Sequence, residues 1–198
     1  MQFSDHRTLA LYLVDYSDNR ELLKHRRAFV LGSLVPDINI CTYVKGLLKG
    51  KPFKMHFTVN SEAAIRRKMR KLTEKKEFTC FDYYRLGVLT HLLADTFTYP
   101  HNEIFPGTMI EHAEYEAREL HPAFKSASRE KILELDLERE KNLWDLCCNA
   151  HENYSKTEPS AQVDICYIVS VCGRVCDSLI PTEKHAAFEL CTWDMYLH

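Results

Sequence analysis

Three segments of this 198-residue sequence carry histidines and carboxylates at spacings that suit metal ions. The central segment, "HLLADTFTYPHN", contains His91 and Asp95, and His101 follows its proline. An α-helix turns once in about 3.6 residues, so His91 and Asp95, which are four residues apart, should share one helical face. His112 and Glu116 in "EHAEYE" have the same spacing and should also share a face.

The third segment is "LGSLVPD", which places Asp37 directly after a proline. Two further histidines, His6 near the start of the chain and His56 in "KMHF", are available as additional ligands. Zinc binds imidazole nitrogen and carboxylate oxygen, and two such ligands one helical turn apart can meet one ion. Two pairs on neighbouring helices, with ligands from the connecting segments, could therefore hold two or three ions.

The alternative for His91 and Asp95 is ordinary hydrogen bonding. A single histidine on a helix is more often hydrogen-bonded or exposed than a metal ligand, and pairs at this spacing are common. These two residues, however, fall inside the most apolar segment, "LGVLTHLLADTF", where unpaired polar groups are costly to bury. A metal ion would be a partner for both His91 and Asp95. Hydrogen bonds between the two side chains, or to neighbouring helices, would also satisfy them.

Apolar residues at helical spacing predict an all-α protein, in which one multi-helix domain spans residues 1–198. We expect the helix at 19–37 to end before Pro36 and the helix at 108–121 to end at Pro122. Residues 38–57 should form a loop with a short helical piece. The predicted helices cover residues 5–16, 19–37, 60–76, 81–99, 108–121, 128–154, 159–180 and 181–197.

Composition excludes several classes of protein. The formal net charge of -2 does not suit a generally basic nucleic-acid binder, so we expect no specific nucleic-acid partner. There are six glycines and no glycine-rich nucleotide loop. No signal peptide or apolar run long enough for a transmembrane segment is present, which predicts a cytoplasmic protein with reduced cysteines. The oligomeric state has no signature in the sequence.

The order of "GSLVPD", "HF", "HLLADTFTYPH" and "EHAEYE" resembles the zinc-dependent phospholipase C family, over about residues 6–120. That family is all-α and is distantly similar to nucleases of the P1 type. The resemblance implies a first zinc ion held by Asp37, His56, His91 and Asp95. Asp95 would bridge to a second ion, which His6 would also bind. A third ion would be held by His101, His112 and Glu116, and Asp37 would be the catalytic base beside the attacking water.

The resemblance implies a metal-dependent hydrolase of phosphoesters, which cleaves a phosphodiester bond with metal-activated water. A phospholipid is one substrate of this class. A nucleotide or other small phosphoester is the alternative substrate, and a non-catalytic metal-binding scaffold is the alternative without turnover. His/carboxylate sites also accept iron or manganese. A basic run at residues 65–76, "IRRKMRKLTEKK", could attract anionic lipid or a polyphosphorylated substrate, or could be a solvated helix face.

The sequence departs from the family at its start. Secreted members begin with a tryptophan whose terminal amine and carbonyl bind a metal, whereas this sequence begins with Met1, Gln2, Phe3 and Ser4. We therefore expect no ligand from the N-terminus, which leaves the site of His6 incomplete, so that the cluster could hold only two ions.

Overall fold

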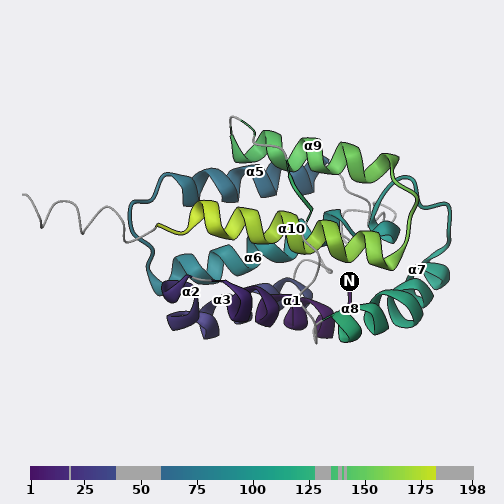
Figure 1. The fold of residues 1–198 in the computed structure, drawn as a ribbon, viewed down its shortest axis with the longest axis horizontal. Helices are drawn as coiled ribbons and strands as arrows, with labels where there is room; N and C mark the ends of the chain where they lie inside the picture. Colours follow the sequence, from purple (N-terminus) through teal and green to yellow (C-terminus); the bar gives the residue numbers. More distant parts are fainter. Residues whose placement is uncertain (18, 39–58, 128–134, 138–139, 141, 182–198) are drawn as a thin grey trace, which may run out of the picture.

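The computed structural model describes residues 1–17, 19–38, 59–127, 135–137, 140 and 142–181, and every regular element in that part is helical (Figure 1). The prediction of an all-α fold is confirmed. The predicted helix at 181–197 and nearly all of the predicted loop at 38–57 lie outside the described residues. The helices are α1 (Phe3–Tyr16), α2 (Arg20–Lys24), α3 (Arg26–Ile38), α5 (Val59–Thr73), α6 (Cys80–Thr96), η1 (Tyr99–His101), α7 (Met109–Tyr115), η2 (Glu116–Leu120), α8 (His121–Ala127), α9 (Leu143–Lys156) and α10 (Ala161–Leu179).

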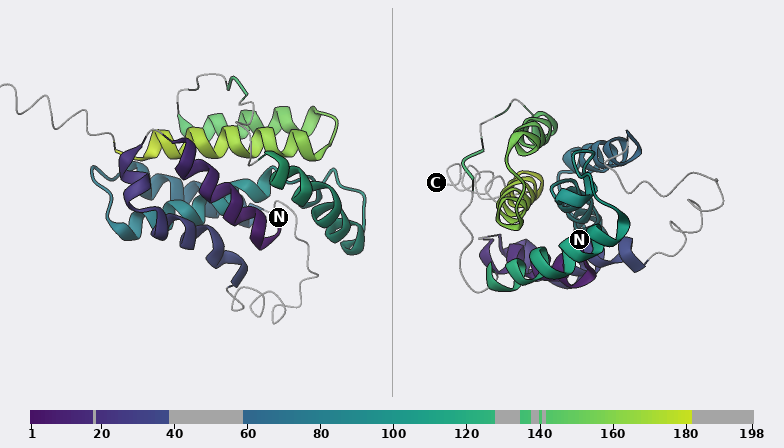
Figure 2. Two further views of the ribbon diagram at one scale, coloured as in Figure 1. Left: turned by 60° about the horizontal axis from the view of Figure 1, so that its bottom comes forward. Right: turned by 90° about the vertical axis from the view of Figure 1, so that its right-hand side faces the viewer.

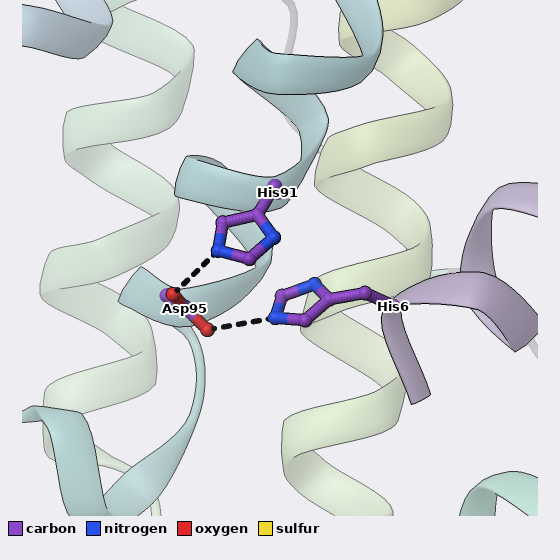
Figure 3. A group of neighbouring side chains, drawn as sticks. All are labelled: His6, His91 and Asp95. Carbon is purple, nitrogen blue, oxygen red and sulfur yellow. Dashed lines mark ion pairs between the residues drawn. The ribbon is translucent and has the colours of Figure 1, made fainter. Parts of the chain in front are cut away.

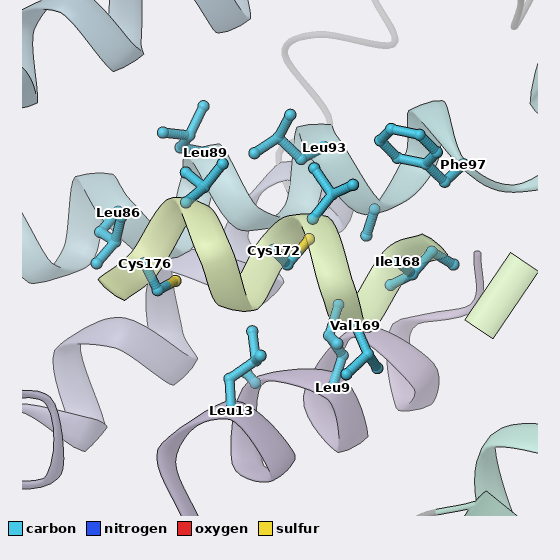
Figure 4. Packing of buried hydrophobic residues seen from close by; sticks show 14 of the residues in the cluster. Leu9, Leu13, Leu86, Leu89, Leu93, Phe97, Ile168, Val169, Cys172 and Cys176 are labelled. Carbon is cyan, nitrogen blue, oxygen red and sulfur yellow. The ribbon is translucent and has the colours of Figure 1, made fainter. Parts of the chain in front are cut away.

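Helix α6 lies in the middle of the bundle and packs against α3, α5 and α10 (Figures 1 and 2). Its apolar residues point in several directions, as expected for a helix enclosed by others. The core that it shares with α1 and α10 includes Leu9, Leu13, Leu86, Leu89, Leu93, Ile168, Val169, Cys172 and Cys176 (Figure 4). Among the described residues these apolar side chains form one cluster, and a single domain over the whole of 1–198 stays a prediction.

The cysteines that the structure describes are all free thiols. Cys172 and Cys176, one turn apart on α10, lie among the leucines of α1 and α6 rather than at a polar site (Figure 4). Burial raises the pKa of Cys176 to about 12, and burial also raises the pKa of Cys172. Both thiols are therefore protonated and act as small apolar residues. No helix in the described part of the chain has the length and apolarity needed to cross a membrane.

Helices α3 and α6 cross at very short range because each has a glycine at the contact. A Cβ atom on Gly32 would lie 2.0 Å from the backbone oxygen of Tyr84, and one on Gly87 would lie 2.1 Å from that of Phe29. No other residue fits at these distances without separating the two backbones. The crossing brings the last turn of α3 beside the last turns of α6, where the candidate ligands lie.

Gly87→Ala is expected to lower the free energy of unfolding by about 2–3 kcal/mol, because overpacking at the crossing outweighs the better helix propensity of alanine. Gly173→Ala is the matched control, since its Cβ would meet only the Cδ2 atom of Leu13, at 3.8 Å. That variant should be neutral or slightly more stable. Urea unfolding followed by circular dichroism measures both, and equal effects of the two substitutions would contradict the role given to Gly87.

The prediction for residues 19–37 was wrong in two respects. The segment is broken into α2 and α3 at His25, and α3 continues through Pro36 to Ile38. A proline in the last turn removes only one backbone hydrogen bond, and the packing of α3 on α6 keeps the chain helical beyond it. Asp37 consequently stays on the helix, one turn after Ser33, instead of entering a loop.

Two other predicted boundaries were wrong. Pro122 does not end its helix, because the chain passes from α7 through a π-helical turn, η2, into α8 without leaving helical geometry. The long helix predicted at 128–154 begins only at Leu143, after an N-cap at Asn142 whose side chain accepts a hydrogen bond from the backbone of Asp145. Residues 135–137 and 140 are not helical, and the backbone N–H of Leu135 donates to the Ser170 hydroxyl at 2.8 Å.

Candidate metal centre

The first group of possible ligands consists of His6 on α1 with His91 and Asp95 on α6 (Figure 3). Asp95 Oδ2 lies 3.3 Å from His91 Nε2, and Asp95 Oδ1 lies 3.3 Å from His6 Nε2. One ligand atom from each of the three residues lies within 4.8 Å of the others, which is close enough for one zinc ion to contact all three. The predicted helical pair has thus gained a third member from the start of the chain.

A backbone contact sets the orientation of His91. Its Nδ1 atom lies 2.8 Å from the carbonyl oxygen of Ser33, which requires Nδ1–H to donate. Nε2 is left facing Asp95 and Asp37, as in metal sites where the second ring nitrogen is held by a carbonyl. Burial lowers the pKa of His91, but the carboxylates of Asp95 and Asp37 outweigh burial and raise the pKa above its ordinary value.

The imidazole of His6 is buried, and among the described residues neither of its ring nitrogens forms a well-aligned hydrogen bond, since Nε2 has only its 3.3 Å contact with Asp95. Its ring stacks on that of His91 with centroids 3.7 Å apart. Burial lowers the pKa of His6 to about 3, so the ring is neutral. A buried, neutral imidazole without a hydrogen bond is a costly arrangement in a folded protein, and a metal ion at Nε2 would satisfy it.

The second group consists of His101 from η1, His112 from α7 and Glu116 at the start of η2. Glu116 Oε1 lies 2.8 Å from His112 Nε2 and 3.1 Å from His101 Nε2. Burial would raise the pKa of Glu116, but its contacts with the two imidazoles and with the N-terminal amine outweigh burial and hold the pKa well below its usual range. The carboxylate is therefore ionised and available to a cation.

The N-terminal amine joins the two groups. The nitrogen of Met1 is fully buried and lies 3.2 Å from Asp95 Oδ1 and 2.9 Å from Glu116 Oε1. Burial lowers the pKa of this amine, but the two carboxylates outweigh burial and raise it, so the group is a cation in this structure. The N-terminus thus places a positive charge between the two groups, and the expectation that it supplies no metal ligand stays a prediction.

Asp95 is the carboxylate that faces both groups. Besides its contacts to His6 and His91, its Oδ1 atom lies 3.6 Å from His101 Nδ1. Burial alone would raise the pKa of Asp95, but the amine and the surrounding imidazoles hold it well below its ordinary value. This position is the one that the resemblance implied for a bridging ligand.

Asp37 approaches the first group from the last turn of α3. Its Oδ1 atom lies 3.6 Å from His91 Nε2, and 32% of its side chain is exposed. Burial raises the pKa of Asp37, and the charge of Asp95 adds to the rise. A carboxylate beside the ligands, partly open to solvent and with a raised pKa, has the properties of a general base.

The structure brings together seven of the eight predicted ligands: His6, Asp37, His91, Asp95, His101, His112 and Glu116. His56 lies outside the described residues. His121 belongs to neither group: it begins α8 and contacts Asp5, with its Nδ1 atom 2.6 Å from Asp5 Oδ1. His151 also lies apart from the two groups, and its Nε2 atom is 2.8 Å from the side-chain oxygen of Asn102.

A buried carboxylate that the sequence analysis missed fixes the segments that carry the second group. Asp164 on α10 is fully buried and accepts hydrogen bonds from the Tyr154 hydroxyl at 2.7 Å, from the Tyr115 hydroxyl at 3.0 Å and from the backbone N–H of Tyr99 at 3.0 Å. Tyr99 opens η1, and Tyr115 directly precedes Glu116. The signal that could have found it is a lone acid in the apolar stretch "AQVDICYIV".

The donor set fits divalent cations. The two groups bring three carboxylates, those of Asp37, Asp95 and Glu116, together with one ammonium group, and burial lowers the pKa of the His6 and His101 imidazoles among them. Buried charge of one sign needs a partner, and imidazole with carboxylate is a ligand set of zinc. With the unsatisfied nitrogens of His6, these observations make the centre suitable for zinc ions.

The comparisons with known proteins agree with this geometry. The model of a family described as zinc-dependent phospholipase C matches residues 5–158, well over half of the chain. The matched part contains all the described ligand side chains and ends before Asp164. No curated protein and no solved structure matches the chain.

Proposed function

Because the chain belongs to the zinc-dependent phospholipase C family, we propose that it is a metal-dependent hydrolase of phosphoesters that cleaves a phosphodiester bond. The observation that carries the proposal is the pair of ligand groups facing each other across Asp95. A phospholipid is the substrate that the family favours. We extend the proposal to the whole sequence as one catalytic domain.

The proposed assignment of ligands to ions is the one that the family resemblance implies. Asp37, His91 and Asp95 would hold one ion, together with His56. His6 would bind a second ion, which Asp95 bridges to the first. His101, His112 and Glu116 would hold the third. Zinc is the proposed metal, and iron or manganese would suit the same ligands.

Zinc in such a centre lowers the pKa of water and neutralises charge on phosphate oxygens. The residues of the chain supply the rest of the chemistry. Asp37 would accept a proton from the attacking water, since its pKa is raised and therefore lies nearer to neutral pH than the pKa of an ordinary aspartate. Ser33 would hold His91 in one tautomer through its carbonyl oxygen. No covalent protein nucleophile is required.

The metal content of protein purified without added metal tests the centre. Elemental analysis is expected to find at least about one equivalent of tightly bound zinc, iron or manganese per chain, because the buried ligands are already assembled. Prolonged dialysis against a chelator should remove the metal together with any activity, and adding zinc back should restore both. Less than one equivalent would contradict the proposal.

A panel of substrates tests the reaction. A chromogenic phosphodiester, a phosphatidylcholine and a single-stranded oligonucleotide separate a phospholipase from a nuclease or a general phosphodiesterase. We expect hydrolysis of the chromogenic diester and the phospholipid. Hydrolysis of the oligonucleotide alone would favour the nucleotide alternative, and metal-bound protein that hydrolyses none of them would favour the scaffold.

A further inference from the structure

A groove between α5 and α9 is lined by none of the candidate metal ligands, and its two parts differ in chemistry. The two helices run along the same side of the molecule (Figures 1 and 2). The groove consists of two hollows of about 840 Å³ and about 400 Å³, and Glu62 and Trp144 line both of them. The larger hollow is rich in arginine and the smaller one is mainly apolar.

The larger hollow collects arginines from one face of α5. Arg66, Arg67 and Arg70 line it, with Asn142 and Trp144 from the start of α9 opposite. The guanidinium carbon of Arg66 lies 5.7 Å from the centre of the Trp144 ring, which holds this side chain across the groove. Arg70 has only a loose ion pair with Glu74, 3.7 Å apart and exposed on both sides. Exposed guanidinium groups of this kind can turn to bind phosphate oxygens in pairs.

Positive charge is crowded on this helix. Lys68 lies between the arginines in sequence, and burial lowers its pKa, as do the charges of Arg67, Arg85 and Lys71. Neighbouring cations raise the free energy of one another, and an anion placed among them lowers it. Glu62 is the acid that lines the basic hollow, against three arginines.

The smaller hollow continues from Trp144 between α5, α6 and α9. Its apolar lining comes from Ile65, Leu93, Phe97, Trp144 and Cys147, of which all except Trp144 are buried. Glu152 and Lys156, which also line this hollow, are paired with each other at 2.6 Å, so their charges are matched. An unbranched hydrocarbon chain fits such a lining, because it gains by leaving water and needs no hydrogen bond.

We propose that this groove binds a single-chain anionic amphiphile, with its phosphate head on Arg66, Arg67 and Arg70 and its alkyl chain in the apolar hollow. Trp144 lies at the junction of the two parts. Free phosphate would leave the apolar hollow without a partner, and a flat membrane surface cannot enter a hollow. The proposal gives the basic run at residues 65–76 a ligand and does not depend on the reaction at the metal centre.

Isothermal titration calorimetry with monomeric dodecyl phosphate, below its micelle concentration, tests the proposal. We expect one saturable site. The double variant Arg66→Gln and Arg70→Gln should bind at least about ten-fold more weakly, since two charge-assisted contacts are lost. The matched control is Arg20→Gln with Arg27→Gln, which removes the same charge from exposed positions on α2 and α3 and should bind as the parent protein does. Equal weakening in both double variants would overturn the proposal.

Two further arms separate the head from the chain. Inorganic phosphate should bind far more weakly than dodecyl phosphate, and dodecyltrimethylammonium should not compete with it. Cys148→Trp places a bulky ring at the exposed edge of the apolar hollow and should weaken dodecyl phosphate binding without changing the helical circular dichroism. Phosphate binding as tight as that of the amphiphile, or displacement by the cationic amphiphile, would overturn the assignment.

Discussion

Asp95→Asn is expected to lower metal affinity and the turnover of a phosphodiester substrate by at least about a hundred-fold. Asp95 contacts His6 and His91 in the first group and His101 in the second, so its carboxylate is common to both. Asparagine keeps the size of the side chain but lacks the negative charge and one of the two ligand oxygens. Metal content by elemental analysis and hydrolysis rates on the same preparation measure the loss.

The matched control is Asp82→Asn, the same substitution in the first turn of α6, more than three helical turns before Asp95. Asp82 Oδ2 binds Lys75 at 2.9 Å and Asp82 Oδ1 binds Arg85 at 3.1 Å, at the end of α6 opposite to the ligands. That variant should lose stability but keep its metal. Full metal content in Asp95→Asn, or equal loss of metal in both variants, would contradict the bridging role of Asp95.

Asp37→Asn gives the contrasting result within the same site. Asp37 lies at the edge of the first group, and its carboxylate is farther from His91 than that of Asp95 is. We therefore expect this variant to keep most of its metal while turnover falls. Unchanged turnover would exclude Asp37 as the base, whereas loss of metal would make it chiefly a ligand.

The helices could be predicted because their signal is local. Apolar spacing along α6 and α10 reflects the faces that each helix buries, and these patterns depend on no distant residue. The failures occurred where tertiary contacts decide the local structure. Pro36 stays helical because α3 is held on α6, and residues near Leu135 leave the expected helix where the backbone binds Ser170 on α10.

The candidate site divides in the same way. The pairs His91 with Asp95 and His112 with Glu116 follow from helical spacing and were predicted. What joins them was not. The crossing of α3 and α6 at Gly32 and Gly87 depends on how distant segments meet, and no short sequence pattern encodes such contacts. The same holds for the Ser33 carbonyl on His91 and for the position of the Met1 amine.

Asp164 is a further residue whose role sequence spacing could not predict. Its substitution is expected to have a large effect on stability. Asp164→Ala should lower the free energy of unfolding by about 3–5 kcal/mol, because three donors from Tyr99, Tyr115 and Tyr154 lose their acceptor in a buried place. Asp164→Asn, which keeps one acceptor oxygen, should lose less. Urea unfolding of the metal-free proteins measures the difference.

Loss of stability alone does not show that Asp164 positions ligands, and Tyr154→Phe supplies the comparison. This variant removes the donor from α9 but leaves the hydrogen bonds of Tyr99 and Tyr115, so it should be less stable by about 1 kcal/mol and bind metal normally. Asp164→Ala also removes the acceptor of the bonds beside His101 and Glu116, so its affinity for the ion of the second group should fall about ten-fold or more. If both variants bind metal equally well, Asp164 stabilises the bundle without orienting the centre.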